Sequence, residues 1–514
     1  MRAACAALSG VIAGFGALAV AELAAAVVRP EAGPVAAVGG AVIDRTPPAL
    51  KDFAVRNFGT DDKLVLELGI LAVLALFAVA VGLLALRHRL TGSAAVLVLG
   101  AVGATAAAGR PEGRVPDALP SVLGALVGAA LLYVLAGRLV RARPSGVRSA
   151  GGFDRRGFVV AAGAAAVASA GAGLLGRRLT SAVRAGAEAS RRDVKLPAPG
   201  SPAPAVPAGA DLGIRGLGPF VTPAKDFYRV DTALVVPRVD AGAWRLRIRG
   251  KGVPRPVTLT FQDLLRREAV ERDITLTCVS NEVGGPYVGN ARWLGVRLAG
   301  LLREAGVRPP SEGGPADQLV ARSVDGMTIG TPVEDVMDGR DALLAFGMNG
   351  EPLPFAHGFP VRMVVPGLYG YVSACKWIKD IELTTFDAYD AYWVRRTWSR
   401  RAPVKTQARI DTPRPFASPK AGTVPVAGVA WAQHRGITRV EVRVDGGPWH
   451  PARLAAPAGR DVWRQWVWEW PATPGSHTLE VRATDRTGAT QTARRAGTVP
   501  DGATGRHSVV VDVS

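Results

Sequence analysis

The chain has 514 residues, and its 62 Lys and Arg against 43 Asp and Glu give a formal net charge of +19. This length exceeds the size at which one hydrophobic core keeps growing, which excludes a lone small domain. Hydrophobic residues make up 48%, mean hydropathy is +0.18 and there are three cysteines, which excludes a disulfide framework and indicates a mixture of membrane and soluble parts.

Five apolar stretches crowd the first third of the chain, at residues 3–28, 64–86, 94–109, 119–140 and 158–175. Each is long enough, or nearly so, to cross a hydrocarbon core of about 30 Å as a helix. The third is the weakest, because it is short and rich in Ala and Gly. We therefore predict a membrane anchor of about five transmembrane helices over residues 1–180, which makes the protein a multi-pass protein of the cell membrane.

Basic residues in the short loops set the expected orientation. Arg87 and Arg89 follow the second stretch, and loops rich in Lys and Arg stay in the cytoplasm. An odd number of spans then leaves everything after Leu175 outside, although Arg177 and Arg178 work against this assignment. The segment between the fourth and fifth stretches adds six arginines to the cytoplasmic side: Arg138, Arg141, Arg143, Arg148, Arg155 and Arg156.

The start of the fifth stretch carries a second feature, at residues 154–176. Asp154-Arg155-Arg156-Gly157-Phe158 precede an alanine-rich, mildly apolar run, and this pattern resembles a twin-arginine export signal. It lacks the usual Ser or Thr before the pair and the Lys after it, and it lies inside the chain. A basic loop before a membrane helix explains the same residues, so both interpretations stand.

The composition and hydrophobic pattern of the sequence change after residue 180. A Pro/Ala-rich segment at residues 181–215 is typical of an extended spacer. Residues 216–402 then show short strands of period two, as at 244–249, and few helices, at 260–266 behind a Thr-x-x-Asp cap and at 298–305. We predict an α+β domain over residues 216–402.

A cluster of prolines at residues 403–419 marks a further boundary. Strand-sized runs follow at 424–429, 437–444, 463–470, 477–483 and 508–513. This spacing over about 95 residues predicts an all-β, immunoglobulin-like sandwich at residues 403–514. No nucleic-acid-binding motif occurs, and basic residues are not interleaved with aromatic ones, so the net charge does not indicate nucleic acid as a partner.

The run from Asp273 to Gly285 is the most informative in the chain. It predicts a strand that delivers Cys278 into a loop of Gly, Ser and Asn, where backbone amides are free to bind a ligand. A lone cysteine is usually a small buried hydrophobe. Here four more motifs follow in order: Gly289-Asn290-Ala291-Arg292-Trp293, Met348-Asn349-Gly350-Glu351-Pro352-Leu353, His357-Gly358-Phe359-Pro360-Val361-Arg362 and Lys376-Trp377.

These motifs together resemble the sulfite oxidase superfamily of molybdenum enzymes, from about residue 220 to the C-terminus. The resemblance implies a membrane-anchored oxidoreductase that uses one Mo-molybdopterin per chain, with Cys278 as the metal ligand and catalytic residue. It also implies oxygen-atom transfer to or from a small molecule, and a homodimer formed through the C-terminal domain. The residues that it assigns to cofactor binding are Tyr228, Arg229, Asp231, Cys278, Asn281, Arg292, His357, Arg362, Ser373 and Lys376.

Two departures from the family pattern leave the substrate open. Val230 aligns with the arginine that binds sulfite in sulfite oxidases, and Trp398 aligns with a tyrosine near the metal. Sulfite oxidase-like chemistry, a sulfoxide-type reductase and a non-catalytic membrane-anchored binding protein therefore stay as alternatives. A basic run can still form an electropositive approach for an anion, although such runs more often form a solvated face: Arg395, Arg396, Arg400, Arg401 and Lys405.

The sequence shows no motif for a second redox centre that could carry electrons to or from the molybdenum. It has no Cys-x-x-Cys-His or iron–sulfur spacing, and His88 is the only histidine among the apolar stretches. Neither a haem nor an iron–sulfur cluster is expected within the chain. We therefore expect an external electron carrier or a membrane redox partner.

Overall fold

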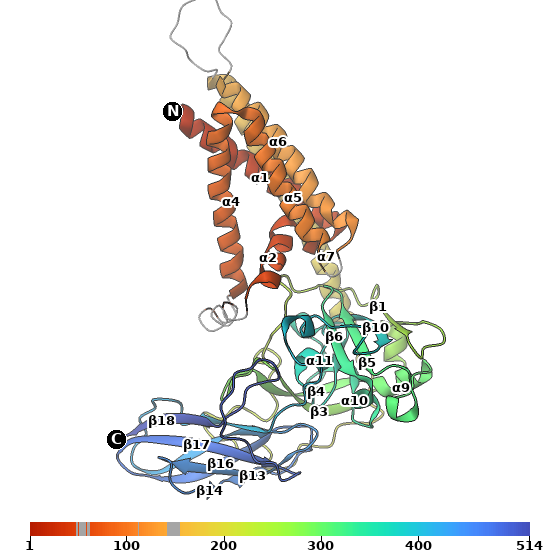
Figure 1. The fold of residues 1–514 in the computed structure, drawn as a ribbon, viewed down its shortest axis with the longest axis vertical. Helices are drawn as coiled ribbons and strands as arrows, with labels where there is room; N and C mark the ends of the chain where they lie inside the picture. The colour runs from red at the N-terminus through yellow and green to blue at the C-terminus, as the bar shows by residue number, and fades with distance from the viewer. Residues whose placement is uncertain (48–49, 51–57, 59–61, 111–112, 141–154) are drawn as a thin grey trace, which may run out of the picture. The chain divides into compact units, whose positions relative to one another are not determined.

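The computed structural model describes residues 1–47, 50, 58, 62–110, 113–140 and 155–514, which form two compact units (Figure 1). Unit 1 comprises Met1–Gly186 and Thr232–Val236, and unit 2 comprises Ala187–Asp231 and Pro237–Ser514. Part of the orientation and export-signal predictions lies outside the described residues, namely Arg141, Arg143, Arg148 and Asp154.

Unit 1 is helical. All five apolar stretches of the sequence fall within helices that are long and apolar enough to cross a membrane. A twelve-residue helix that the sequence did not predict, α2, lies between the first two. The helices are α1 (Arg2–Val28), α2 (Pro34–Arg45), α4 (Asp62–Arg87), α5 (Arg89–Ala108), α6 (Leu119–Val140) and α7 (Arg155–Asp193), with short 3-10 turns η1 (Pro30–Ala32) and η3 (Val115–Ala118).

Small residues let the helices of unit 1 pack closely. Helix α1 contacts both α4 and α6. A Cβ added at Gly10 would lie 1.9 Å from the carbonyl oxygen of Ala78, and one added at Gly82 would lie 2.3 Å from the carbonyl oxygen of Ala6. Close backbone approach through Gly and Ala is the packing mode of membrane helices, where the hydrophobic effect does not drive helices together.

A buried ion pair joins the loops at one end of these helices. Arg29, just after α1, donates to the carboxylate of Asp117 in η3, which is only 3% exposed. The same carboxylate accepts the backbone N–H of Arg114 at 2.9 Å. The turn before α6 is therefore tied to the end of α1.

The short segment Thr232–Val236 also belongs to unit 1, although the residues on both sides of it belong to unit 2. Lys63 donates to the carbonyl oxygen of Ala233 at 2.7 Å. Leu234 is buried, and its side chain lies so close to Gly39 of α2 that a Cβ there would be 2.7 Å from Cδ2. The helices thus hold a loop that interrupts unit 2 in sequence.

Helix α7 and the residues after it differ from the predicted spacer at 181–215. The helix continues to Asp193, and its last residues belong to unit 2, where Arg191 donates to the carbonyl oxygens of Pro352 and Leu353, both at 2.7 Å. Beyond the helix, the carbonyl of Ser201 accepts the N–H of Glu271 at 2.9 Å. Proline prevents regular structure here, but the free backbone groups bind the body of unit 2.

The first part of unit 2 is built on two sheets, with only short helices beside them. One sheet has the order β2-β1-β10-β5-β6, in which only the β1–β10 pair is parallel. Its strands are β1 (Arg245–Gly250), β2 (Val257–Thr260), β5 (Gln318–Ser323), β6 (Thr328–Pro332) and β10 (Ile378–Thr384), and the helices are α8 (Phe261–Leu265), α9 (Leu298–Glu304), α10 (Val333–Met337) and α11 (Gly370–Ser373).

The predicted helix cap in this part is confirmed. Thr260 accepts the N–H of Asp263 at 3.1 Å, and the carboxylate of Asp263 accepts the N–H of Thr260 at 2.8 Å. This reciprocal pair starts α8 directly after strand β2.

The second sheet positions the cysteine. Its order is β3-β4-β7-β8, with β9 paired to β7. The antiparallel register matches Thr277 with Val288, so the intervening loop with Cys278 lies at one end of the sheet. Strand β3 is an edge strand of the sheet. The strands are β3 (Val270–Thr277), β4 (Val288–Arg297), β7 (Leu343–Met348), β8 (Glu351–Pro352) and β9 (Arg362–Val364).

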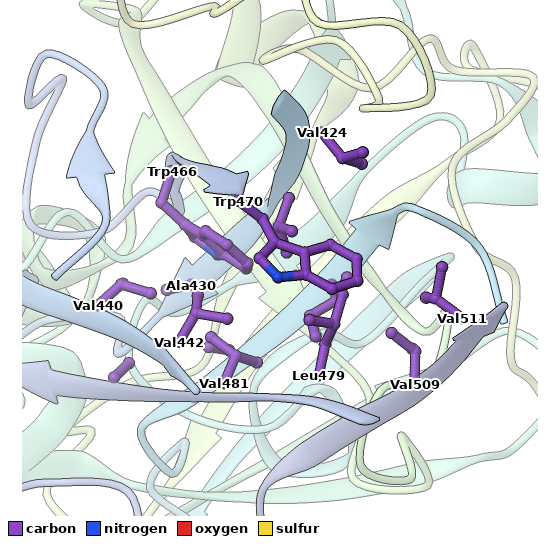
Figure 2. Close-up of a cluster of buried hydrophobic side chains, with 14 of the residues drawn as sticks. Val424, Ala430, Val440, Val442, Trp466, Trp470, Leu479, Val481, Val509 and Val511 are labelled. Carbon is purple, nitrogen blue, oxygen red and sulfur yellow. The ribbon is translucent and has the colours of Figure 1, made fainter. Parts of the chain in front are cut away.

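The C-terminal part is made of two four-stranded antiparallel sheets, β11-β12-β16-β15 and β14-β13-β17-β18. Figure 2 shows how Trp466 and Trp470 from the first sheet meet Val442, Leu479 and Val511 from the second in one buried core. Each strand run predicted by the sequence falls on a strand. The strands are β11 (Gln407–Thr412), β12 (Gly422–Trp431), β13 (Ile437–Val444), β14 (His450–Pro451), β15 (Arg453–Leu454), β16 (Arg464–Ala472), β17 (Gly475–Asp485) and β18 (His507–Val513).

Candidate active site

Cys278 is the first residue of a hydrogen-bonded loop that follows β3. Its N–H donates to the carbonyl oxygen of Tyr287 at 2.9 Å, and its own carbonyl oxygen accepts the N–H of Asn281 at 3.1 Å. The amide oxygen of Asn281 in turn accepts the N–H of Tyr287 at 2.7 Å. These bonds fix the loop, so the position of the buried thiol is defined by the backbone around it.

Burial and the neighbouring polar groups have opposite effects on the pKa of the Cys278 thiol. Burial raises the pKa of Cys278, whereas hydrogen bonds from the N–H and hydroxyl of Ser280 and the positive charge of Lys376 act to lower it. Such donors stabilise a thiolate. A metal ion bound to the sulfur would add the missing charge compensation, since a coordinated thiol is deprotonated.

Tyr228 lies beside the cysteine. Its ring stacks on Phe227 with centroids 5.2 Å apart, and burial together with the nearby Cys278 raises the pKa of its phenol. Phe227 also meets Trp293 and His357 edge to face, at 5.8 and 5.6 Å. The phenol is therefore a neutral hydrogen-bond donor held in an aromatic wall.

Arg362 is the most deeply buried cation near this wall. Its guanidinium lies 4.9 Å from the ring centroid of Trp293 and donates to the carbonyl oxygen of His357 at 3.2 Å. Burial lowers the pKa of Arg362 to about 10. Its Nε is buried and has no hydrogen-bond partner among the residues that the structure describes. A buried donor of this kind costs free energy unless a ligand accepts from it.

Lys376 and Arg229 share one counterion. The carboxylate of Asp231 accepts from Lys376 Nζ at 2.5 Å and from Arg229 Nε at 2.9 Å. Burial lowers the pKa of Lys376 to about 8, with Asp231 opposing the shift. Two cations thus face one carboxylate in this group, which leaves net positive charge next to Cys278 and Arg362.

His357 adds a neutral ring to the same group. Burial, and then the charge of Arg362, lowers the pKa of His357 to about 4. Its Nε2 lies 2.9 Å from the carbonyl oxygen of Ala224, which can only accept, so Nε2 carries the proton. The next residue, Gly358, at φ +109°, packs against Arg362 and Lys376: a Cβ there would lie 3.1 Å from the Cα of Lys376.

Three more residues predicted from the sequence to bind the cofactor, Arg292, Ser373 and Asn281, have partners or positions unlike those of Arg362 and Lys376. Arg292 forms a two-pronged ion pair with Asp273 across β3 and β4, at 2.9 and 2.8 Å, and is partly exposed. The hydroxyl of Ser373 donates to the carbonyl oxygens of Leu368 and Tyr369 at 3.0 Å. Asn281 stays in the cysteine loop, where its Nδ2 is buried without a partner in the described part of the chain.

The predicted electropositive approach at residues 395–405 is largely engaged within the protein. Arg396 stacks 3.6 Å from the ring centroid of Tyr392. Arg400 and Lys405 form ion pairs with Asp390 and Asp501, at 2.9 and 2.8 Å. These contacts leave the run less charged towards solvent than its sequence indicates.

The two positions that depart from the family pattern are also placed. Trp398 lies against Tyr371, with ring centroids 5.6 Å apart, and the hydroxyl of Tyr371 donates to the carbonyl oxygen of Ser399 at 2.7 Å. Val230 is 42% exposed, between Arg229 and Asp231 of the cationic group. Neither position therefore offers a charged group to an anion.

Comparison with known proteins decides the family of this region. Residues 233–393 match the model of the oxidoreductase molybdopterin binding domain. Human mitochondrial sulfite oxidase is 29% identical over 303 residues, which cover 51% of this chain and 55% of the human protein. Residues 233–393 belong to the sulfite oxidase superfamily. The molybdopterin-binding domain so defined contains Cys278 and Lys376, whereas Tyr228 and Asp231 lie just before it.

Two other relatives show the breadth of this similarity. The NADH-dependent nitrate reductase 1 of rice is 30% identical over 332 residues, covering 54% of this chain and 35% of that protein. The solved structure of the sulfane dehydrogenase SoxCD from Paracoccus pantotrophus matches with a TM-score of 0.50 and 26% identity, covering 58% of this chain and 84% of that one. The chain spans about half the length of human sulfite oxidase.

Sequence reasoning missed one residue close to the cysteine. Tyr369 is buried, and burial raises the pKa of its phenol, with Cys278 among the nearby groups that add to the shift. Its hydroxyl accepts the N–H of Lys405 at 3.4 Å. Tyr369 lies outside the motifs named above, between the His357–Arg362 run and Lys376-Trp377, so no specific signal in the sequence marks it.

Proposed function

We propose that this protein is a molybdopterin-dependent oxidoreductase that catalyses oxygen-atom transfer in unit 2. The observation that carries the proposal is the group of buried donors around one thiol, with Arg362 Nε and Asn281 Nδ2 both lacking acceptors within the described residues. These donors suit an anionic cofactor, and the thiol suits a soft metal. When bound, the molybdenum centre supplies the two-electron change that accompanies transfer of an oxygen atom.

The residues of the chain take distinct roles in this proposal. Cys278 binds the metal as a thiolate, and the amide and hydroxyl of Ser280 hold its sulfur. Arg362 and Lys376 bind the negative charge of the pterin phosphate. His357 stays neutral and Tyr228 stays protonated at neutral pH, so both act as hydrogen-bonding groups rather than as charges.

The substrate is proposed by class only. The relatives named above act, by their names, on sulfite, nitrate and sulfane, so we propose a small oxygen-containing or sulfur-containing substrate. A sulfoxide-type reductase is the second candidate, and the aromatic pair Trp398–Tyr371 favours it because it offers apolar surface in place of the tyrosine expected from sulfite oxidases. An external electron carrier completes either reaction.

The helices of unit 1 are proposed to anchor the enzyme in the cell membrane, with unit 2 on the outer face. Support comes from five helices of sufficient length and apolar character. Residues 154–176 serve in this proposal as the export signal or as a basic membrane flank. A reporter active only outside the cell, fused after Leu196, tests the orientation: activity is expected, and a cytoplasmic signal would reject it.

The C-terminal sandwich is proposed to be an immunoglobulin-like dimerisation domain. Its two packed four-stranded sheets support the fold assignment. Sedimentation of the detergent-solubilised full chain tests the homodimer, and a monomer at micromolar concentration would contradict it.

Metal analysis of the full chain is the direct test of the function. Protein made in a host that synthesises the cofactor is expected to contain about one molybdenum per chain. Full-length protein is used because a shorter fragment that begins after α7 would lose Arg191, which donates to the carbonyl oxygens of Pro352 and Leu353. Absence of molybdenum would overturn the proposal. A screen of sulfite, sulfoxides and N-oxides with artificial electron carriers then separates the two candidate substrates.

A further inference from the structure

The free edge of strand β3 is covered by the C-terminal sandwich next to the cysteine. The N–H of Thr275, on the outer side of this edge strand, donates to the carbonyl oxygen of Asp461 at 2.9 Å. The hydroxyl of Thr275 accepts the N–H of Trp463 at 2.8 Å. Backbone groups at the end of β3 are therefore bound by the sandwich rather than by water.

Gln433, which follows β12, continues this contact towards Cys278. Its side-chain Nε2 donates to the carbonyl oxygen of Thr275 at 3.1 Å and to the hydroxyl of Thr277 at 2.8 Å. The side chain is 1% exposed. Thr277 directly precedes the cysteine, so one buried amide from the sandwich fixes the last residues of β3 before Cys278.

The other side of the cysteine loop is also held by the sandwich. Arg409 of β11 donates to the carbonyl oxygen of Gly285 at 2.9 Å. His507 of β18 fills the space beside Gly284, where a Cβ would lie 2.1 Å from its Cδ2. The ring nitrogen Nδ1 of His507 is held in turn by the N–H of Ile410 at 3.0 Å.

We propose that the C-terminal sandwich positions the cysteine loop, with Gln433, Arg409 and His507 as positioning residues for Cys278. The sandwich then has a role in the metal site that is independent of dimer formation. Both ends of the loop are bound by residues more than 120 positions away in sequence, so the geometry of the thiol depends on the packing of the two parts of unit 2. The metal readout below rests on the proposed function, and the thiol readout does not.

The test compares two buried glutamines in the full-length protein. Gln433→Met removes the amide that holds β3, and Gln491→Met is the matched control, because Gln491 is also buried and its side chain pairs with Ala483 and Gly505 within the sandwich. In protein made without cofactor, iodoacetamide should alkylate Cys278 about tenfold faster in Gln433→Met than in the wild type or the control. Mass spectrometry of the peptide containing Cys278 measures the rate.

The second readout is spectroscopic. In cofactor-loaded protein, Gln433→Met should shift the Mo(V) electron paramagnetic resonance signal, which reports the metal–sulfur geometry, while Gln491→Met leaves it unchanged. Equal alkylation rates and equal spectra in the two variants would overturn the inference. Wild-type protein without molybdenum would instead overturn the proposed function, while the alkylation rates would still decide the inference.

A second variant pair keeps the test decisive if Gln433→Met fails to fold. Arg409→Gln removes the donor to Gly285, whereas Arg443→Gln removes an arginine that pairs with Glu480 on the sandwich surface. Faster alkylation of Cys278 is expected only in Arg409→Gln. The same rate in both would contradict a positioning role.

Discussion

The two units of this protein stabilise their interiors by different means. In unit 1, Gly and Ala let apolar helices approach closely, as at Gly10 and Gly82. In unit 2, a molybdopterin-binding domain buries cations beside a thiol and leaves Arg362 Nε without a partner among the described residues. Among the described residues of unit 1, Arg29 Nε and Ser121 Oγ are also buried without hydrogen-bond partners, at a cost of about 1 to 3 kcal/mol each, so unmet donors alone do not separate the units. The difference between the units is the group of buried cations, Arg362 and Lys376, beside the thiol of Cys278, which is the arrangement expected where an anion binds.

The largest expected effect separates the two buried cysteines of unit 2. Cys278→Ser should abolish turnover and reduce bound molybdenum strongly, because a hydroxyl is a poor ligand for a soft metal. Cys375→Ala should retain the metal, since the thiol of Cys375 donates to the backbone carbonyl oxygen of Lys376 at 3.7 Å. Metal analysis and activity of both full-length variants measure this. Loss of molybdenum in Cys375→Ala with retention in Cys278→Ser would reverse the assignment.

A second prediction compares two arginines of the molybdopterin-binding domain. Arg362→Gln should weaken cofactor retention by about 10- to 100-fold, because a buried cation is lost whose Nε has no partner among the described residues. Arg292→Gln should weaken it by less than about fivefold, because the partly exposed Arg292 is already paired with Asp273. Cofactor release during dialysis gives both values. Equal losses would show that Arg292 also binds the cofactor.

Acid should destabilise unit 2 through its buried histidines. The pKa values of His357 and His507 are lowered by burial to about 4, so the folded protein keeps both rings neutral where the unfolded chain binds protons. Stability is full above pH 6.5 and falls as the pH drops towards 4, by about 2 to 3 kcal/mol for each ring. Tryptophan fluorescence follows unit 2 alone, because all eleven tryptophans lie there.

The control for the acid prediction is His507→Asn. The asparagine oxygen can still accept the N–H of Ile410 but does not titrate in this range. The variant should show a shallower loss of stability between pH 6.5 and 4. A slope equal to that of the wild type would contradict the assigned pKa.

The smallest expected effect is confined to unit 1. Gly82→Ala should force α1 and α4 apart, because the new Cβ would lie 2.3 Å from the carbonyl oxygen of Ala6, at a cost of about 1 to 3 kcal/mol. Helix melting by circular dichroism in detergent should begin earlier. Gly69→Ala, on the same helix but with open space beside it, is the matched control. An equal change in both variants would contradict close packing at Gly82.

Local patterns predicted the elements well. The strand before Cys278, the cap at Thr260 and the five apolar helices each depend on neighbouring residues, so periodicity and capping chemistry were enough to find them. The predicted extended spacer is instead bound to unit 2, for example by the hydrogen bond between Ser201 and Glu271. Its proline content does not predict such a partner.

Only the residues of the candidate site that lie in family motifs could be predicted from the sequence. Cys278, Arg362 and Lys376 carry family motifs and lie in one group. The pairing of Arg292 with Asp273 depends on the register of β3 and β4, which the sequence alone does not give. Gln433 contacts β3 across more than 150 residues of sequence, and nothing in its local sequence marks it as part of the site.

The segment Thr232–Val236 constrains how this enzyme can be divided. The chain leaves unit 1 after Gly186, returns to it for five residues and leaves again, so the two units are connected at two places along the sequence. A recombinant unit 2 that began at Ala187 would still carry Leu234, but without the helical residues that bury it. The first of those five residues directly follows Asp231, the counterion of Lys376. Removing the helices of unit 1 would therefore release the chain directly after Asp231.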